Sequence, residues 1–235
     1  EHGHGLGMIH QVPCVGTKLM EPAISINFDM LETDDRRGAG RAYGDRFSGN
    51  NSAANAVNLG DMTNRARIER PLSTNGAAGP SNSDEDWFRF STTATRNLTV
   101  VVEPLGGTYT TGQQSSGCTG TSSSRNAIAA GNLNVELRSS DGTTVVAAAA
   151  SAAAGAIETL TFNNLPAGAY TVRVFDVGPN NATDQTIQLY SLTVRLGGNI
   201  APPYANAGVD KRVAANTNCS FMGDVNSAPT ETGTT

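Results

Sequence analysis

The sequence predicts a mostly β protein, an antiparallel β-sandwich preceded by a short helical segment. Charged residues make up only 16% of the chain, and it holds 26 glycines, as many short strands and turns require. Apolar and polar residues also alternate with a period of two along several segments after Asp86. This alternation is typical of strands that bury one face in a core.

The alternation predicts six strands. They are expected at 87–91, 98–102, 133–137, 158–162, 170–174 and 190–196. Asp141-Gly142 and Pro166-Ala167-Gly168 are typical turn sequences between such strands. Three segments rich in Ser, Thr, Asn or Gly are interpreted as a linker and two long surface loops, at 49–61, 73–83 and 108–126.

The first 45 residues differ from the rest because they hold all three histidines and a short amphipathic run at 34–43. We expect a helix, an irregular loop and a second helix there. A Gly-Gly-Asn run and Pro202-Pro203 mark a second boundary near 197–203. The expected domains are therefore 1–46, 47–197 and 198–235.

Charge and hydropathy exclude some partners. A net charge of −5 leaves no basic stripe for nucleic acid or for an anionic membrane surface. The Ala-rich stretch 147–156 is too short and too weakly apolar to span a bilayer. The chain opens without an initiator Met, so we expect it to be cut from a longer precursor. Three scattered cysteines leave the pairing open, at positions Cys14, Cys118 and Cys219.

The chemistry is concentrated in the first ten residues, which read EHGHGLGMIH. Glu1, His4, Gly7 and His10 have the spacing of HExxHxxGxxH without its first histidine, the pattern of metzincin zinc peptidases. A histidine before Glu1 would lie one helical turn from His4, so both imidazoles could bind one zinc ion. Gly7 can end the helix in a left-handed conformation and let the chain deliver His10.

Three neutral imidazoles leave a fourth zinc position for water, and Glu1 would accept a proton from that water as general base. His2 falls at a variable position of the pattern and is not expected to bind the catalytic metal. The alternative is a Gly/His-rich or tag-like terminus whose histidines are surface residues.

The next residues resemble the same family. The segment TKLMEP resembles the metzincin Met-turn, which implies that Met20 is an apolar floor under the zinc, although an ordinary core methionine would pack similarly. The run LETDDRRGAGRAYGD resembles the closing helix of matrixin catalytic domains. Pro22 stands where astacin-like members have a tyrosine, which also favours a matrixin-like branch.

Residues from about 50 to 196 resemble the bacterial pre-peptidase C-terminal domain, a jelly-roll-like sandwich, in the segments NNSAANAVNLG, DEDWFRF, GAYTVRV and LYSLTV. The resemblance implies calcium ligands at Asn50, Asn51, Asp84 and Asp86, because oxygen atoms suit this hard cation. The alternative is a solvated turn before a strand. The tail NIAPPYANAGVDKRVAAN resembles the start of a PKD-type immunoglobulin-like domain, or it is a plain linker.

These observations lead to one functional hypothesis and two alternatives. We expect part of a secreted bacterial zinc endopeptidase that cleaves protein or peptide substrates, with the sandwich as an accessory module. With only His4 and His10 as histidine ligands, this chain alone is expected to bind zinc weakly and to be inactive. The first alternative is a noncatalytic module that binds protein or polysaccharide, with Phe175 as its clearest outward aromatic. The second is a structural stalk with a chance HxxGxxH remnant.

Overall fold

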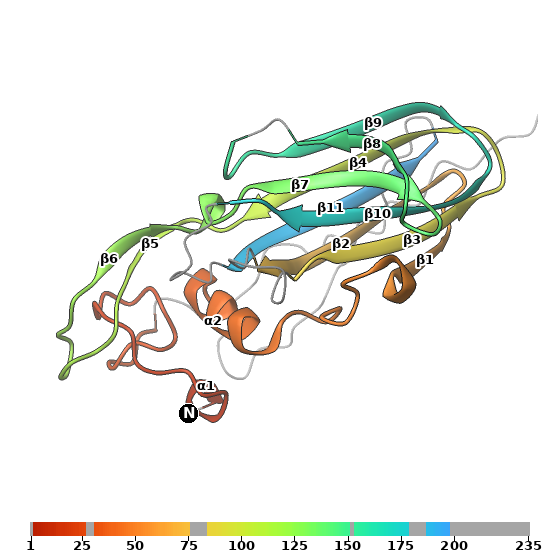
Figure 1. The fold of residues 1–235 in the computed structure, drawn as a ribbon. Coiled ribbons are helices and arrows are strands. Elements are labelled where there is room, and N and C mark those ends of the chain that lie inside the picture. The colour runs from red at the N-terminus through yellow and green to blue at the C-terminus, as the bar shows by residue number, and fades with distance from the viewer. Residues whose placement is uncertain (1, 27–30, 76–83, 151–152, 179–186, 198–235) are drawn as a thin grey trace, which may run out of the picture.

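The protein is a two-sheet β-sandwich with a helical N-terminal segment at one end (Figure 1). The computed structural model describes residues 2–26, 31–75, 84–150, 153–178 and 187–197. The first sheet has the strand order β1 (Val57–Asp61), β3 (Asp86–Thr92), β10 (Gly168–Asp176), β7 (Leu133–Ser139) and β8 (Val145–Ala149). The second has the order β2 (Arg65–Asn75), β11 (Ile187–Leu196), β4 (Arg96–Leu105) and β9 (Glu158–Leu165).

The other elements lie outside these sheets. They are α1 (His2–Gly5), α2 (Thr33–Tyr43), the hairpin strands β5 (Thr108–Thr111) and β6 (Ser123–Asn126), and two 3-10 turns, η1 (Ala53–Asn55) and η2 (Ala127–Ala129). Strand pairing is antiparallel throughout the two sheets except between β1 and β3, which are parallel. None of the helices in the described ranges is long and apolar enough to cross a membrane.

The core is formed by the period-two face of each strand. On β4 every second side chain from Leu98 to Val102 is at most 1% exposed, and Phe88 and Phe90 of β3 are buried in the same cluster from the opposite sheet. Each such side chain contributes about 1.5–3 kcal/mol by leaving water. The mostly β class and the antiparallel sandwich are thus confirmed.

All six predicted strands are found, and both turn predictions are correct, with Gly142 in a left-handed conformation (φ 74°) between β7 and β8. Three loop assignments were wrong in part. Segment 49–61 contains β1, segment 73–83 begins with the end of β2, and segment 108–126 contains β5 and β6. The tail 198–235 lies outside the described residues.

These strands were missed for a physical reason. β1 is an edge strand with a single buried residue, Leu59, so no alternation marks it. β5 and β6 pair with each other away from the core and have no buried residue in either strand. Backbone hydrogen bonding stabilises them, and a sequence rich in Ser and Thr does not reveal such pairing.

The N-terminal segment is anchored on the sandwich through α2. The side chain of Arg37 donates from Nε to the Ile187 carbonyl of β11 (2.9 Å) and from a guanidinium nitrogen to the Tyr109 hydroxyl of β5 (2.5 Å). Gly40 faces β11, since a Cβ there would lie in ordinary van der Waals contact with the Ile187 side chain, at 3.4 Å. The helix predicted near 34–43 is therefore present and packs against β11.

Candidate metal centre

The local fold of the first ten residues follows from one glycine. Helix α1 ends at Gly5, and Gly7 then takes φ 74°, a left-handed conformation that a side chain would disfavour. The amides of Leu6 and Met8 both donate to the carbonyl of Gly3, at 3.1 and 3.0 Å. The chain thereby reverses, as expected from Gly7, and returns His10 to the side of His4.

The two histidines meet through their Nε2 atoms, which lie 3.0 Å apart, with the rings inclined at 64°. Each Nδ1 has a carbonyl partner. That of His4 lies 3.1 Å from the Met8 carbonyl oxygen, and that of His10 lies 2.9 Å from Gln114 Oε1. Because a carbonyl oxygen only accepts, both Nδ1 atoms must carry the proton. When both rings are neutral, both Nε2 atoms then present lone pairs to each other.

Two facing lone pairs repel each other unless a proton or a metal cation lies between them. Two nitrogens bound to one zinc ion at about 2.0–2.1 Å with a tetrahedral angle lie about 3.3 Å apart, close to the observed separation. His4 is exposed and His10 is half-buried, so the shared position is open to solvent. The donor set of these two residues therefore fits a zinc ion.

Met20 lies under α1. Its side chain is 5% exposed, and its sulfur occupies the space where a Cβ on Gly3 would sit, only 2.1 Å away. The carboxylate of Asp35 on α2 fixes the backbone there by accepting from the Leu19 amide (3.0 Å) and the Met20 amide (3.3 Å). The structure thus places Met20 against the helical turn that carries His4.

The rest of the predicted site is not visible. Glu1 and the side chain of His2 lie outside the described residues. Within the ranges that the structure describes, no group of three or more His, Cys, Asp or Glu side chains could hold a metal ion. The third histidine ligand and the general base therefore stay predictions.

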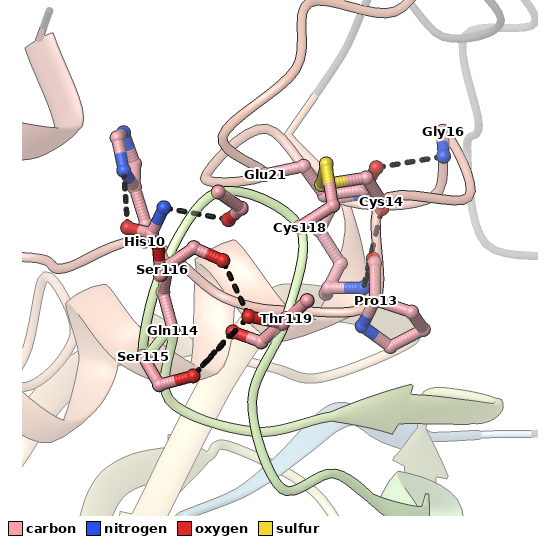
Figure 2. The surroundings of a disulfide bond; sticks show 12 residues. His10, Pro13, Cys14, Gly16, Glu21, Gln114, Ser115, Ser116, Cys118 and Thr119 are labelled. Atoms are coloured by element: carbon pink, nitrogen blue, oxygen red, sulfur yellow. Dashed lines mark hydrogen bonds and ion pairs between the residues drawn. A yellow bond between two sulfur atoms is a disulfide. The ribbon is translucent and has the colours of Figure 1, made fainter.

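The turn between β5 and β6 lies against the chain that follows His10. Figure 2 shows a disulfide that joins Cys14 to Cys118, a pairing that sequence reasoning left open, whereas Cys219 lies outside the described residues. Lys18 is 1% exposed and donates to the Thr110 carbonyl of β5 (3.1 Å) and to Glu21 (3.2 Å).

Glu21 holds the loop formed by residues 16–21 together. Its carboxylate accepts from the amides of Gly16 (2.7 Å) and Thr17 (2.8 Å). Burial alone would raise the pKa of Glu21, but these two amides and the Lys18 ammonium outweigh it and lower the pKa. The carboxylate therefore stays ionised, and the loop that leads to Met20 is held by charge-assisted hydrogen bonds.

A cavity of about 500 Å³ lies between this N-terminal segment, α2 and the hairpin. Met20, Arg37 and Tyr109 are among its lining residues, and neither His4 nor His10 lines it. The cavity is therefore separate from the position that the two Nε2 atoms share.

The four residues expected to bind calcium come together at the start of β3. Asn50 donates from Nδ2 to the Trp87 carbonyl (3.2 Å), and the Trp87 amide returns a bond to the Asn50 carbonyl (3.0 Å). With its amide group turned to satisfy both contacts, Asn51 donates to Asp84 Oδ1 (3.0 Å) and to the Glu85 carbonyl (2.7 Å). Asp86 begins β3, and one of its oxygens accepts from the Tyr190 hydroxyl.

Two features of this cluster bear on cation binding, although its carboxylates do not by themselves form a group of three that could hold a metal ion in the described residues. Among the described residues, Asn50 Oδ1 and Asp86 Oδ1 are buried oxygens without a hydrogen-bond partner. Burial, and then the charge of Asp45, raises the pKa of Asp84 to about 6, and the same two causes raise that of Asp86 well above its usual value. A divalent cation would offset this repulsion and satisfy the free oxygens.

Sequence reasoning missed Asp45. Its Oδ2 accepts from the Ser73 amide of β2 (2.9 Å), which holds the carboxylate close enough to raise the pKa of Asp84 and Asp86. In the sequence Asp45 ends the Tyr-Gly-Asp run that resembles the end of the matrixin closing helix, and that resemblance gives no sign of a cation site.

Three comparisons with known proteins bear on the sandwich. Residues 84–176 match the family described as "Bacterial pre-peptidase C-terminal domain". No curated protein matches the chain. Two solved structures are similar over 60% of this chain at 12% identity and a TM-score of 0.32: the pre-peptidase C-terminal domain of a collagenase from Bacillus anthracis (93% of that chain covered) and PliG from Aeromonas hydrophila, a periplasmic inhibitor of g-type lysozyme (96% covered).

The matched residues begin with Asp84 and end with the last residue of β10, so they include the start of β3 and its calcium candidates Asp84 and Asp86. Strands β1 and β2 precede the matched residues in the sequence and β11 follows them, and these three strands complete the two sheets. Residues 84–176 of this chain are therefore similar to the bacterial pre-peptidase C-terminal domain.

Proposed function

We propose that this chain is part of a secreted bacterial zinc endopeptidase of the metzincin type, in which His4 and His10 are zinc ligands. One observation carries the proposal. Both Nδ1 atoms are committed to carbonyl oxygens, and the two Nε2 lone pairs converge to 3.0 Å. Neutral imidazoles that present their lone pairs to one point are arranged as metal ligands are.

The residues of this chain have separate tasks in peptide-bond hydrolysis. A bound zinc ion would polarise the peptide carbonyl and increase the acidity of the attacking water. Glu1, from its place in the motif, accepts the proton of that water and passes it to the leaving amine. The left-handed turn at Gly7 sets the position of His10, and Met20 supports the turn that carries His4.

The sandwich acts as the accessory part of this peptidase. The binding-module alternative depends on exposed aromatic side chains, and its clearest candidate, Phe175, is covered by the Arg173 guanidinium at 4.1 Å from the ring centroid. Trp87, on the same sheet, is 8% exposed and lies beside the guanidinium groups of Arg138 and Arg173. We therefore favour a supporting role over carbohydrate or protein capture.

Calcium is the second cofactor that we propose, at the cluster of Asn50, Asn51, Asp84 and Asp86. The buried free oxygens and the raised pKa values of the two aspartates support it. The charge of Asp45 also acts on the two aspartates. This cation would join the end of the N-terminal segment to β3 and so stabilise the boundary between the two parts.

Metal titration tests the zinc proposal. The chain, His4→Ala, His10→Ala and the matched control His2→Ala are titrated with Zn²⁺ against a chromophoric chelator, and with Co²⁺, whose visible spectrum reports nitrogen ligands. We expect His4→Ala and His10→Ala to lose most of the affinity and His2→Ala to keep it. Equal binding by all four proteins would overturn the proposal.

A further inference from the structure

The β5–β6 hairpin belongs to the sandwich by sequence, but its turn contacts the N-terminal segment that carries His10. Figure 1 shows it leaving the two sheets and extending to the N-terminal segment. There Gln11 pairs with Gln113 in an antiparallel bridge, the Val12 amide donates to the Gly112 carbonyl (2.8 Å), and the Gln114 amide donates to the His10 carbonyl (3.2 Å). Residues 10–12 thus lie alongside the turn between β5 and β6 and are joined to it by one isolated bridge.

Gln114 is held in one orientation. Its Nε2 donates to the Gly117 carbonyl at 2.6 Å, within the same turn. The amide nitrogen is thereby directed away from His10, and Oε1 faces His10 Nδ1 at 2.9 Å (Figure 2). Because Oε1 can only accept, Gln114 keeps the proton on Nδ1 of His10 and leaves Nε2 free to bind metal.

Two features hold the hairpin in this position. The Cys14–Cys118 disulfide lies four residues beyond both His10 and Gln114. The turn and the N-terminal segment also pack too closely for a larger residue at Gly120. A Cβ there would lie 2.8 Å from the Val12 side chain and 2.2 Å from the Gln113 carbonyl oxygen. The distance between His10 and Gln114 is therefore fixed by the covalent bond and by close packing.

We propose that Gln114 is a positioning residue of the zinc site, and that the accessory sandwich thereby completes the metal centre through the disulfide-anchored β5–β6 hairpin. This inference rests on the proposed function. Partners of metal-binding histidines commonly set the tautomer and ring orientation, and their loss typically lowers metal affinity by about 10–100-fold.

The variants separate this role from a structural one. Gln114→Leu keeps the size but removes the acceptor, whereas Gln114→Glu keeps an acceptor and loses only the donor to the Gly117 carbonyl. Gln113→Ala changes the neighbouring residue of the turn and is the matched control. Zn²⁺ affinity is measured by chelator competition, and the tautomer of His10 is assigned from nitrogen-15 NMR of the metal-free proteins.

We expect Gln114→Leu to bind Zn²⁺ about 10–100-fold more weakly and to lose the single Nδ1–H tautomer of His10, while Gln114→Glu and Gln113→Ala retain both. If Gln114→Leu binds zinc as the unchanged chain does, the inference is overturned and the proposed function stands. If the unchanged chain binds no zinc, the proposed function fails, and so does the role of Gln114 in zinc binding. The NMR result then decides only whether Gln114 fixes the tautomer of His10.

Discussion

The Cys14–Cys118 disulfide should dominate the stability of the unit that joins the N-terminal segment to the sandwich. It closes a ring between residues 104 positions apart, which includes β1 to β5. In the chain-entropy treatment, a ring of this size lowers the entropy of the unfolded chain by an amount worth about 4.7 kcal/mol at 25 °C. For a domain of this size, that corresponds to a fall in Tm of roughly 10–20 °C when the bond is removed.

The assay is urea unfolding of the Cys14→Ser/Cys118→Ser protein, followed through the fluorescence of Trp87, the one tryptophan of the chain. Trp87 is 8% exposed on β3, within the five-stranded sheet, so it reports the sandwich itself. Cys219→Ser is the matched control and should leave the midpoint unchanged. A loss of less than about 1 kcal/mol would mean that the segment detaches separately from the sandwich, which would refute the reasoning.

Four further predictions concern the site and the core. Gly3→Ala should displace Met20 and destabilise the N-terminal segment by about 1–3 kcal/mol, measured by hydrogen exchange in α1. Millimolar Ca²⁺ at pH 7 should raise the Tm, and Asp84→Asn together with Asp86→Asn should abolish that increase. In EDTA, stability should fall as pH rises from about 4 to about 6, because the folded state, with the pKa of Asp84 raised to about 6, binds more protons in that window; a flat profile contradicts this. Leu137→Ala should cost about 2–5 kcal/mol in urea unfolding.

The strands that face the core could be predicted because a strand with one buried face has apolar residues at every second position of its sequence. Leu98, Val100 and Val102 on β4 show this, and so do Leu192 and Val194 on β11. β5 and β6 could not be found in this way. Their pairing depends on backbone hydrogen bonds and on the N-terminal segment, so their side chains carry no such pattern.

Part of the candidate metal centre could also be predicted from the sequence. The spacing around Gly7 predicted the reversal that brings His10 to His4, because only glycine takes a left-handed conformation without strain. Gln114 was not predictable, since it lies more than a hundred residues from His10 in a segment without periodicity. The Cys14–Cys118 pairing was not predictable either, because the positions of three cysteines in the sequence do not reveal which two are neighbours in the fold.

Zinc content and proteolysis, measured together, test the central claim most directly. The protein for this test is a form that carries the histidine expected before Glu1, compared with its Glu1→Ala variant. The account predicts about one zinc ion in each protein and cleavage of an unfolded protein substrate only by the form with Glu1 intact. Absence of zinc from both proteins, or undiminished cleavage by Glu1→Ala, would contradict it.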